Sequence, residues 1–448
     1  MYWNIDQFCN DVSILENLKA SVSIYAKISE IESKKIEKFI EYTPSLPKKL
    51  IQLLSKILQI LQEIKNEDQI VYYTNLMIMI TDILSNLVEN FGDEFENNLN
   101  SVDIYNDILA CVNLKLDTEA FQAITWFLET IIQQIHIPIN ISEWMFEIYA
   151  VMLEKASQEE FCFNDQMTEV LINSFSGIHT LTINSEAALW EFIGNEILLD
   201  LIIGILNTVQ ASEKSNDQVL LNGAKIIAKL SEYDYNEKYL KKGVYAILYK
   251  IMFTSQNSNI LAECMNALTN FCVLSPHIRI NIVQKDAIIA IIQKSIGLSS
   301  FVLKHETVLF LDMFLDTHSE SEKFLELMFK DLDIMNSVID MICDSLDNEN
   351  EDQRLKAIMI SYLGRLLEAE QTYYKNHGKY EKNVNYSNVL SEKDVIEKLE
   401  NIDTSNHSLR QLALKIRFAL DFVKPDSNNE DSFTNPKEED IFQTDLQF

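Results

Sequence analysis

Glycine and proline are scarce in this chain of 448 residues, which contains 9 glycines and 6 prolines. An average protein contains roughly 7% glycine and 5% proline. Residues that break helices are therefore rare, and apolar residues recur at helical spacing between short polar breaks such as Ser255 to Ser258. Strand-like alternation of apolar and polar residues is also scarce. The sequence thus predicts an all-α protein.

Catalytic motifs and clustered metal ligands are lacking as well. His305 and Glu306 stand in the segment HETVL, which lacks the second histidine of a zinc-binding H-E-x-x-H motif. No glycine-rich phosphate loop, G-x-S-x-G elbow or cysteine and histidine constellation occurs. The six cysteines form no C-x-x-C pair and are Cys9, Cys111, Cys162, Cys264, Cys272 and Cys343. We therefore expect reduced, mostly buried thiols, no enzymatic activity, no cofactor and no bound metal.

Basic residues are strongly outnumbered, because 37 lysines and arginines stand against 68 aspartates and glutamates, a net charge of −31. This charge makes extended contact with a phosphate backbone unfavourable and favours basic partners. The alternative is that the acidity only keeps a long helical protein soluble. We expect protein partners and no nucleic acid.

Long apolar runs are also absent. The longest, around residues 197–206, contains Asp200 and is too short to span a bilayer. The first residues, MYWNIDQFCNDVSILENL, lack the basic region followed by an apolar run that is typical of a secretory signal. We therefore expect no membrane association, and a protein of the cytosol or nucleus.

What the chain does contain is an internal repeat. From Glu237, the segment EKYLKKGVYAILYKIM predicts a short helix, a turn at Gly243 and a second helix, and NSNILAECMNALTNFC predicts a third. The same order follows in PHIRINIVQKDAIIAIIQKSIG and VLKHETVLFLDMFLD. Such modules bury their apolar faces only against neighbouring modules. Equivalent positions in the third helices are Asn86, Thr130, Gly177, Lys229, Asn270, Met313 and Arg365.

The intervals between these positions are 44, 47, 52, 41, 43 and 52 residues. Armadillo and HEAT arrays repeat every 40 to 47 residues or so, and the longer intervals indicate loop insertions. The sequence therefore predicts an armadillo-type, right-handed α-solenoid superhelix of about nine to ten three-helix repeats. We expect the solenoid over residues 1–423, with an insertion loop at 369–393, and an acidic, disordered tail at 424–448.

Several segments resemble the importin-α (karyopherin-α) family of nuclear-import adaptors, whose third helices carry W-x-x-x-N. EAFQAITWFLETI is similar to one such helix, with Trp126 at the tryptophan position and Thr130 at the asparagine position. NGAKIIAKLSEYD resembles the family's central repeat, and SYLGRLLEAE and VNYSNVLSEKDVIEKLENIDTSNHSLRQLALKIRFALDFV resemble its last repeats. The likeness covers roughly residues 13–423.

The resemblance implies a concave groove that binds an extended basic segment of a protein partner. In the family, asparagines bind the backbone of the segment, tryptophans pack against lysine or arginine stems, and nearby carboxylates attract the charge. The implied groove residues are Trp126, Thr130, Asn86, Asp82, Asn270 and Asn266, with Glu89, Asp93 and Glu94 as the acidic residues near the groove. The alternatives are core packing for the tryptophan, caps or solvated positions for the asparagines, and a solvated loop for the acidic cluster.

The chain also departs from the family pattern. Apart from Trp126, the tryptophan positions hold Asp82, Asn173, Lys225, Asn266 and Leu309. The family's N-terminal basic segment, which binds importin-β, has no counterpart, because the nearest basic run, at residues 34–38, lies among glutamates. Importin-β is therefore not an expected partner.

Taken with the resemblance, the sequence predicts an adaptor that binds cargo proteins through basic segments for nuclear import. Such an adaptor is found in the cytoplasm and the nucleus, and the acidic C-terminal region implies contact with an export receptor. The alternative is an armadillo or HEAT-like scaffold for protein–protein interaction that is unrelated to nuclear transport.

Overall fold

The computed structural model describes residues 46–158, 165–212, 216–233, 238–239, 242–274, 287–298, 300–315, 325–326, 332–348, 352–377, 390, 395–400, 411, 413–414 and 416. Every regular element within these ranges is a helix, and none is a strand. The predicted all-α class is therefore confirmed. The chain divides into two compact units, Met1–Thr254 and Ser255–Phe448, and each is described by itself.

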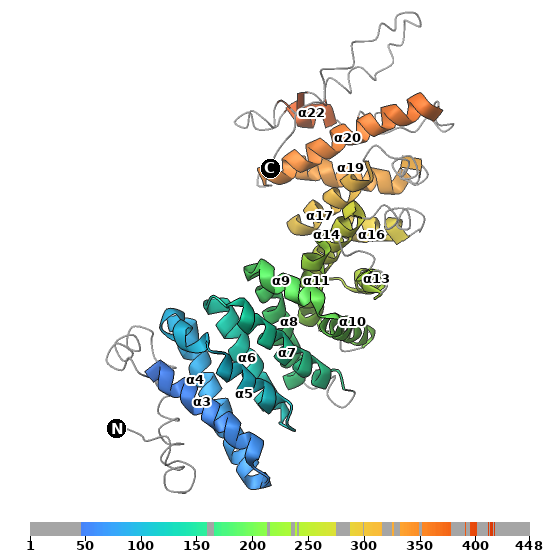
Figure 1. Cartoon of the computed structure of the whole chain (residues 1–448). Coiled ribbons are helices and arrows are strands. Elements are labelled where there is room, and N and C mark those ends of the chain that lie inside the picture. The colour runs from blue at the N-terminus through green and yellow to red at the C-terminus, as the bar shows by residue number, and fades with distance from the viewer. Residues whose placement is uncertain are drawn as a thin grey trace, which may run out of the picture. The chain divides into compact units, whose positions relative to one another are not determined.

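The described helices of the first unit form two rows (Figure 1). They are α3 (Leu46–Glu63), α4 (Glu67–Leu99), α5 (Val102–Val112), α6 (Thr118–Gln134), α7 (Ile139–Ala156), α8 (Asp165–Asn184), α9 (Glu186–Gly194), α10 (Glu196–Ala211), α11 (Asp217–Ser231) and α13 (Val244–Thr254). In one row α4, α6, α8 and α11 pack against one another in that order, and we call it the third-helix row. In the other, the second-helix row, α3, α5, α7, α10 and α13 follow in the same way.

Helix α6 shows why the sequence folds in this manner. Asp117 caps its first turn, because the side-chain oxygen accepts the Ala120 backbone N–H at 2.8 Å. Its apolar side chains repeat at intervals of three and four and are buried between the rows: Ala120, Phe121, Ala123, Ile124, Phe127, Leu128, Ile131 and Ile132. The remaining face of α6 stays accessible. Burial of such stripes from adjacent helices holds the two rows together.

The three-helix module is present in parts of the first unit. Helix α4 is broken at Phe91, whose φ of −145° and ψ of 44° are not helical, so residues 92–99 form a short helix ahead of α5 and α6. The chain bends by 80° between α9 and α10, which precede α11. Between α6 and α7, in contrast, only Ile135 to Pro138 intervene. No short first helix fits there, so α7 and α8 form a two-helix module. The number of repeats and the superhelix remain predictions.

The predicted turn at Gly243 is confirmed, because this glycine has a φ of +78°. A side chain with a Cβ is strained in this conformation, which explains the glycine at the start of α13.

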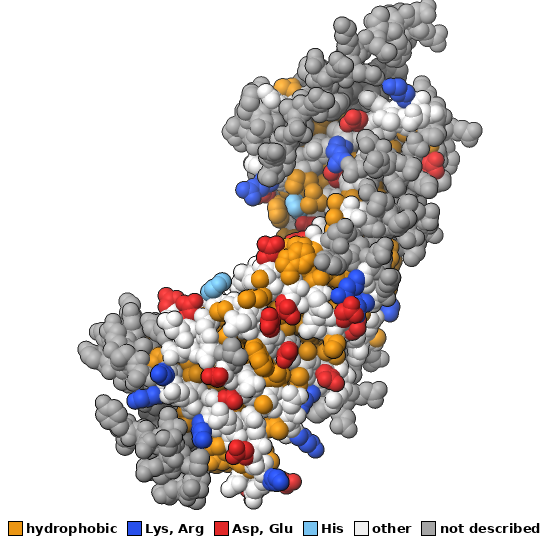
Figure 2. Space-filling view, in the orientation of Figure 1, with side chains coloured by type: hydrophobic (Ala, Val, Ile, Leu, Met, Phe, Trp, Pro, Cys, Tyr) orange, Lys and Arg blue, Asp and Glu red, His pale blue; other side chains and the backbone are white. Residues whose placement is uncertain are grey.

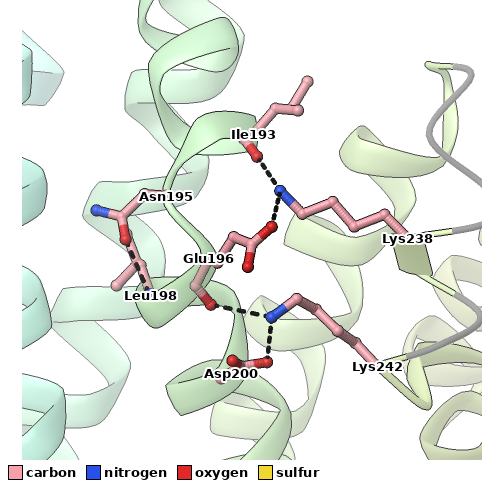
Figure 3. Close-up of polar contacts among 7 residues, drawn as sticks. All are labelled: Ile193, Asn195, Glu196, Leu198, Asp200, Lys238 and Lys242. Atoms are coloured by element: carbon pink, nitrogen blue, oxygen red, sulfur yellow. Dashed lines mark hydrogen bonds and ion pairs between the residues drawn. The ribbon is translucent and has the colours of Figure 1, made fainter.

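Two lysines just before this turn join neighbouring modules (Figure 3). The ammonium of Lys238 donates to the Ile193 carbonyl at the end of α9 at 2.8 Å and contacts the Glu196 carboxylate at 3.3 Å. The ammonium of Lys242 contacts the Asp200 carboxylate at 2.6 Å and the Glu196 carbonyl at 3.4 Å. Both cations therefore lie at the bend between α9 and α10. Lys238 contacts the C-terminal end of α9, which carries partial negative charge, and Lys242 contacts the carboxylate of Asp200 near the start of α10.

Replacing both lysines by methionine (Lys238→Met and Lys242→Met) should lower the free energy of unfolding by about 2 kcal/mol, since each pair is partly exposed and contributes about 1 kcal/mol. The methionines keep most of the aliphatic packing, so the loss reports the polar contacts. Urea unfolding followed by circular dichroism measures the change. Lys48→Met, at an exposed position of α3, is the control and should leave the midpoint unchanged. Equal midpoints for the double variant and the wild type would show that the contacts of Lys238 and Lys242 do not stabilise the protein.

The second unit repeats the two-row arrangement (Figure 1). Its described elements are α14 (Ser258–Leu274), α16 (Ala287–Ile296), α17 (Phe301–Asp312), the short 3-10 helix η2 (Met313–Leu315), α19 (Leu332–Asp347), α20 (Gln353–His377) and α22 (Val395–Glu400). Helix α14 packs on α17 and α17 on α20, while α16 packs on α19 and α19 on α22. An ion pair between Arg365 and Asp312 joins α20 to α17.

Helix α20 continues to His377, into the segment 369–393 for which the sequence predicts an insertion loop. The rest of that segment, apart from Leu390, lies outside the described residues, as do residues 1–45 and the predicted tail at 424–448. The domain boundaries remain predictions.

Within the described residues, the stretch Glu67–Asp93 of α4 has the length and composition of a membrane-spanning helix, and 56% of the 18-residue apolar window in it is buried inside the protein. The bent pair of α9 and α10 passes the same test when taken together. Core helices of soluble proteins commonly meet these criteria, and α4 packs between α3 and α6. The absence of membrane association stays a prediction.

Candidate peptide-binding pocket

A pocket of about 580 Å³ lies across three consecutive helices of the third-helix row, α4, α6 and α8. We call it the Trp126 pocket. It is lined by Ile78, Asp82, Glu119, Gln122, Ala123, Trp126, Glu129, Glu169 and Asn173. Each helix contributes side chains three, four or seven positions apart, which share one helix face. The pocket is therefore a property of the row and not of a single loop.

Trp126 is the only aromatic residue among the lining residues. Its neighbours Thr125 and Phe127 are fully buried, whereas Trp126 itself is partly exposed. The indole N–H has no hydrogen-bond acceptor within the described part of the chain. The partly exposed ring of Trp126 therefore offers an aromatic surface to a ligand in the pocket.

The charge of the lining residues is entirely negative. Four of the nine carry carboxylates, from Asp82, Glu119, Glu129 and Glu169, and none is a lysine or arginine. Burial, and then the charge of Glu119, raises the pKa of Asp82 to about 6. Burial also raises the pKa of Glu129, with a further contribution from Glu169 that is opposed by a hydrogen bond with Ser176. A raised pKa means that the charged form of the carboxylate is destabilised. A bound cation would therefore stabilise the ionised carboxylates of Asp82 and Glu129.

Three of the four carboxylates, those of Asp82, Glu119 and Glu169, form no ion pair or hydrogen bond within the described ranges. Glu129 differs, because Gln133 Nε2 donates to its Oε1 at 3.0 Å. Carboxylates gathered around an exposed indole match the requirements of a lysine or arginine side chain, whose stem packs on the ring and whose charge attracts the acids. Figure 2 shows acidic side chains, with some basic ones, among apolar and neutral side chains on the visible face of the first unit.

The six sequence-predicted groove residues lie in different surroundings. Asp82 and Trp126 line the pocket together. Asn86 lies one turn beyond Asp82 and donates through Nδ2 to the Asp82 carbonyl at 2.9 Å. Thr130 is buried, and its hydroxyl donates to the Trp126 carbonyl at 2.9 Å. Since a threonine has one hydroxyl hydrogen, Thr130 does not offer a donor to a peptide in this structure.

Asn266 and Asn270 belong to α14 of the second unit, where Asn270 Nδ2 donates to Asn266 Oδ1 at 3.3 Å. They are therefore described apart from the Trp126 pocket. Of the acidic residues predicted near a groove, Glu89 and Asp93 are exposed on α4 but do not line the pocket. The Glu94 side chain lies outside the described part of the structure.

Glu119, Glu129 and Glu169 are the functional candidates that sequence reasoning missed. Glu119 and Glu129 stand seven positions before and three positions after Trp126, so helical periodicity alone places them on its face. Glu169 stands four positions before Asn173, the residue aligned with Trp126 on the next third helix. The spacing around Trp126 therefore marks Glu119 and Glu129, whereas the place of Glu169 opposite Trp126 depends on the packing of α8 on α6.

Gly177 occupies the asparagine position on α8, and the structure gives the reason. Tyr149 reaches from α7 to this glycine, so a Cβ at residue 177 would lie 2.2 Å from the Tyr149 hydroxyl oxygen. The tyrosine is fully buried. Packing against the second-helix row therefore excludes an asparagine here.

No protein-family model matches the chain, and no curated protein matches it. Among solved structures, SYS-1 in complex with POP-1 is similar over 92% of this chain and 82% of that chain, at 12% identity and a TM-score of 0.48. SYS-1 alone is similar over 90% of this chain and 85% of its own, at 12% identity and a TM-score of 0.47. An engineered protein is similar over 61% of this chain and 98% of its own, at 13% identity and a TM-score of 0.42. At these values the likenesses do not assign the chain to a family.

Proposed function

We propose that this protein is an armadillo-like scaffold that binds a partner protein by holding a lysine or arginine side chain of an extended segment in the Trp126 pocket. The observation that carries the proposal is the lining of that pocket, which combines four carboxylates and a partly exposed indole with no basic residue. Repeated helices in rows supply long surfaces that suit protein partners. We further propose that the protein is not an enzyme, since no catalytic motif occurs in its sequence.

Three observations favour a side chain of a protein over a free metal ion as the ligand of the pocket. The aromatic ring of Trp126 attracts an organic cation with an apolar stem. No group of three histidine, cysteine or carboxylate ligands that could hold a metal occurs within the described residues. The pocket also extends over three helices, which an extended segment can follow.

The resemblance to importin-α supports a more specific proposal, which we call the transport form. In this form the partner is a cargo protein that is carried into the nucleus. The general scaffold is the form we favour, because the family's pattern is retained only at Trp126, Asn86 and Asn270. Imaging of the tagged protein with nuclear export blocked separates the two. Accumulation in the nucleus supports the transport form, and an unchanged cytoplasmic distribution supports the scaffold. In the transport form the protein occupies both cytoplasm and nucleus and contacts an export receptor through its C-terminal region.

The central experiment is binding of a short, fluorescently labelled, lysine-containing peptide measured by anisotropy. We expect binding that weakens as salt is added, because exposed charges are screened. Trp126→Ala should weaken binding about tenfold, which corresponds to the loss of a cation–π contact and its apolar packing. The control is Phe301→Ala, which removes an exposed aromatic ring from the second unit. Affinity that is the same in Trp126→Ala and the wild type would overturn the proposal.

A further inference from the structure

A group of basic residues lies one helix beyond the Trp126 pocket in the third-helix row. Lys225 and Lys229 stand four positions apart on α11 and are partly exposed on one face. His179 of α8 lies beside them, and burial together with the charges of both lysines lowers the pKa of this imidazole to about 4. The two ammonium groups therefore share a region with a neutral histidine. We call these three residues the lysine patch.

The other groups around the lysine patch leave one cation uncompensated. The ammonium of Lys229 pairs with the Glu232 carboxylate at 2.5 Å and lies 5.8 Å from the centre of the Tyr233 ring. Lys225, in contrast, forms no ion pair or hydrogen bond with any described residue. The charge of the side chains along the third-helix row thus changes from negative around Trp126 to positive at Lys225.

The lysine patch is held at a fixed place relative to the Trp126 pocket. Helix α8 packs on both α6 and α11, and Asn222 of α11 donates through Nδ2 to the Ile172 carbonyl of α8 at 3.3 Å. The residue after Ile172, Asn173, lines the pocket. A segment that crosses the row from α6 to α11 therefore meets both regions in turn.

The distance can be expressed in residues of a bound segment. Packed helices lie about 8–10 Å apart, so two steps, from α6 through α8 to α11, cover about 20 Å. An extended chain advances about 3.3 Å per residue, and this distance corresponds to about six residues.

We propose that the partner segment carries charges of both signs, with a carboxylate side chain, recognised by Lys225, about six residues from the cation held at Trp126. This inference rests on the proposed function and adds the chemistry of the partner to it. A segment with basic residues throughout is disfavoured, because it would bring a second cation to Lys225. The order of charges along the segment then selects partners.

The test compares three labelled peptides that share one lysine cluster. The first has glutamates about six residues away, the second has glutamines there, and the third has the glutamates about two residues away. We expect the first to bind about fivefold more tightly than the other two, as for a partly exposed ion pair. Lys225→Gln should abolish this advantage and Lys225→Glu should reverse it. The control, Lys48→Gln on α3, changes the net charge equally and should preserve the advantage.

The outcomes separate the two proposals. If the glutamine peptide binds in a Trp126-dependent manner but the glutamates give no advantage, the inference is wrong and the proposed function stands. An advantage that persists in Lys225→Gln also overturns the inference. If none of the peptides binds, both are wrong. A phosphoserine at the glutamate position should bind at least as tightly as glutamate, because it carries more negative charge.

Discussion

Neutralising three carboxylates of the Trp126 pocket together (Asp82→Asn, Glu119→Gln and Glu169→Gln) should weaken binding of the lysine-containing peptide about hundredfold, since each partly exposed charge contact contributes up to about 1 kcal/mol. The measurement is made at a pH well above 6, because the pKa of Asp82 is about 6 and its carboxylate must be ionised in the wild type. Glu129 is retained in this variant, since it also accepts a hydrogen bond from Gln133.

The matched control removes the same number of charges from the second-helix row, through Glu63→Gln, Glu143→Gln and Glu147→Gln at exposed positions of α3 and α7. This variant has the same net charge as the pocket variant. It should lose less than about threefold in affinity, because distant exposed charges are screened. If both variants bind the peptide equally, the attraction comes from the overall charge of the protein and the Trp126 pocket is not the binding site.

Gly177→Ala should lower the free energy of unfolding by about 3 kcal/mol, the upper part of the range for overpacking a well-packed core. The added Cβ would lie 2.2 Å from the hydroxyl oxygen and 2.7 Å from Cζ of Tyr149. The tyrosine is fully buried, so its ring must shift against packed neighbours to admit the added Cβ. Chemical denaturation of the purified variant measures the change.

Two further variants test the cause of this loss. Gly204→Ala should be neutral or stabilising by up to about 1 kcal/mol, because nothing lies within 4 Å of its new Cβ. Tyr149→Phe should stabilise the protein by about 1 kcal/mol, since it removes a buried hydroxyl that has no partner among the described groups. In the Tyr149→Phe background Gly177→Ala should cost less than it does alone. An equal cost in both backgrounds would show that the hydroxyl contact is not responsible.

Much of the local structure could be predicted from the sequence. The helical spacing of apolar residues predicts α6, and the glycine at 243 predicts the turn that a φ of +78° confirms. Alignment of the third helices placed Asp82 and Trp126 at equivalent positions, and the structure brings both into one pocket. The helix and the turn depend on residues close together in the sequence, whereas the equivalence of Asp82 and Trp126 follows from the repeat.

The remaining features depend on packing between distant segments. The pattern around Trp126 does not show that Glu169, from α8, lies across from it, because this follows from how closely α6 and α8 pack. Tyr149 fills the space over Gly177 from a different row. The hydroxyl of Thr130 bonds to its own helix, which the resemblance to an asparagine position did not indicate. The break at Phe91 stands next to Gly92, which weakens a helix, but a glycine alone does not specify where a helix breaks.

Lys238 and Lys242, the lysines before Gly243, affect how the first unit unfolds. Lys238 and Lys242 belong to one module, whereas the oxygen atoms that they contact belong to the module before it. If the later module frays, the carbonyl of Ile193 and the carboxylates of Glu196 and Asp200 lose their cations at the same moment. These contacts couple the two modules, so that opening of the later module destabilises the one before it.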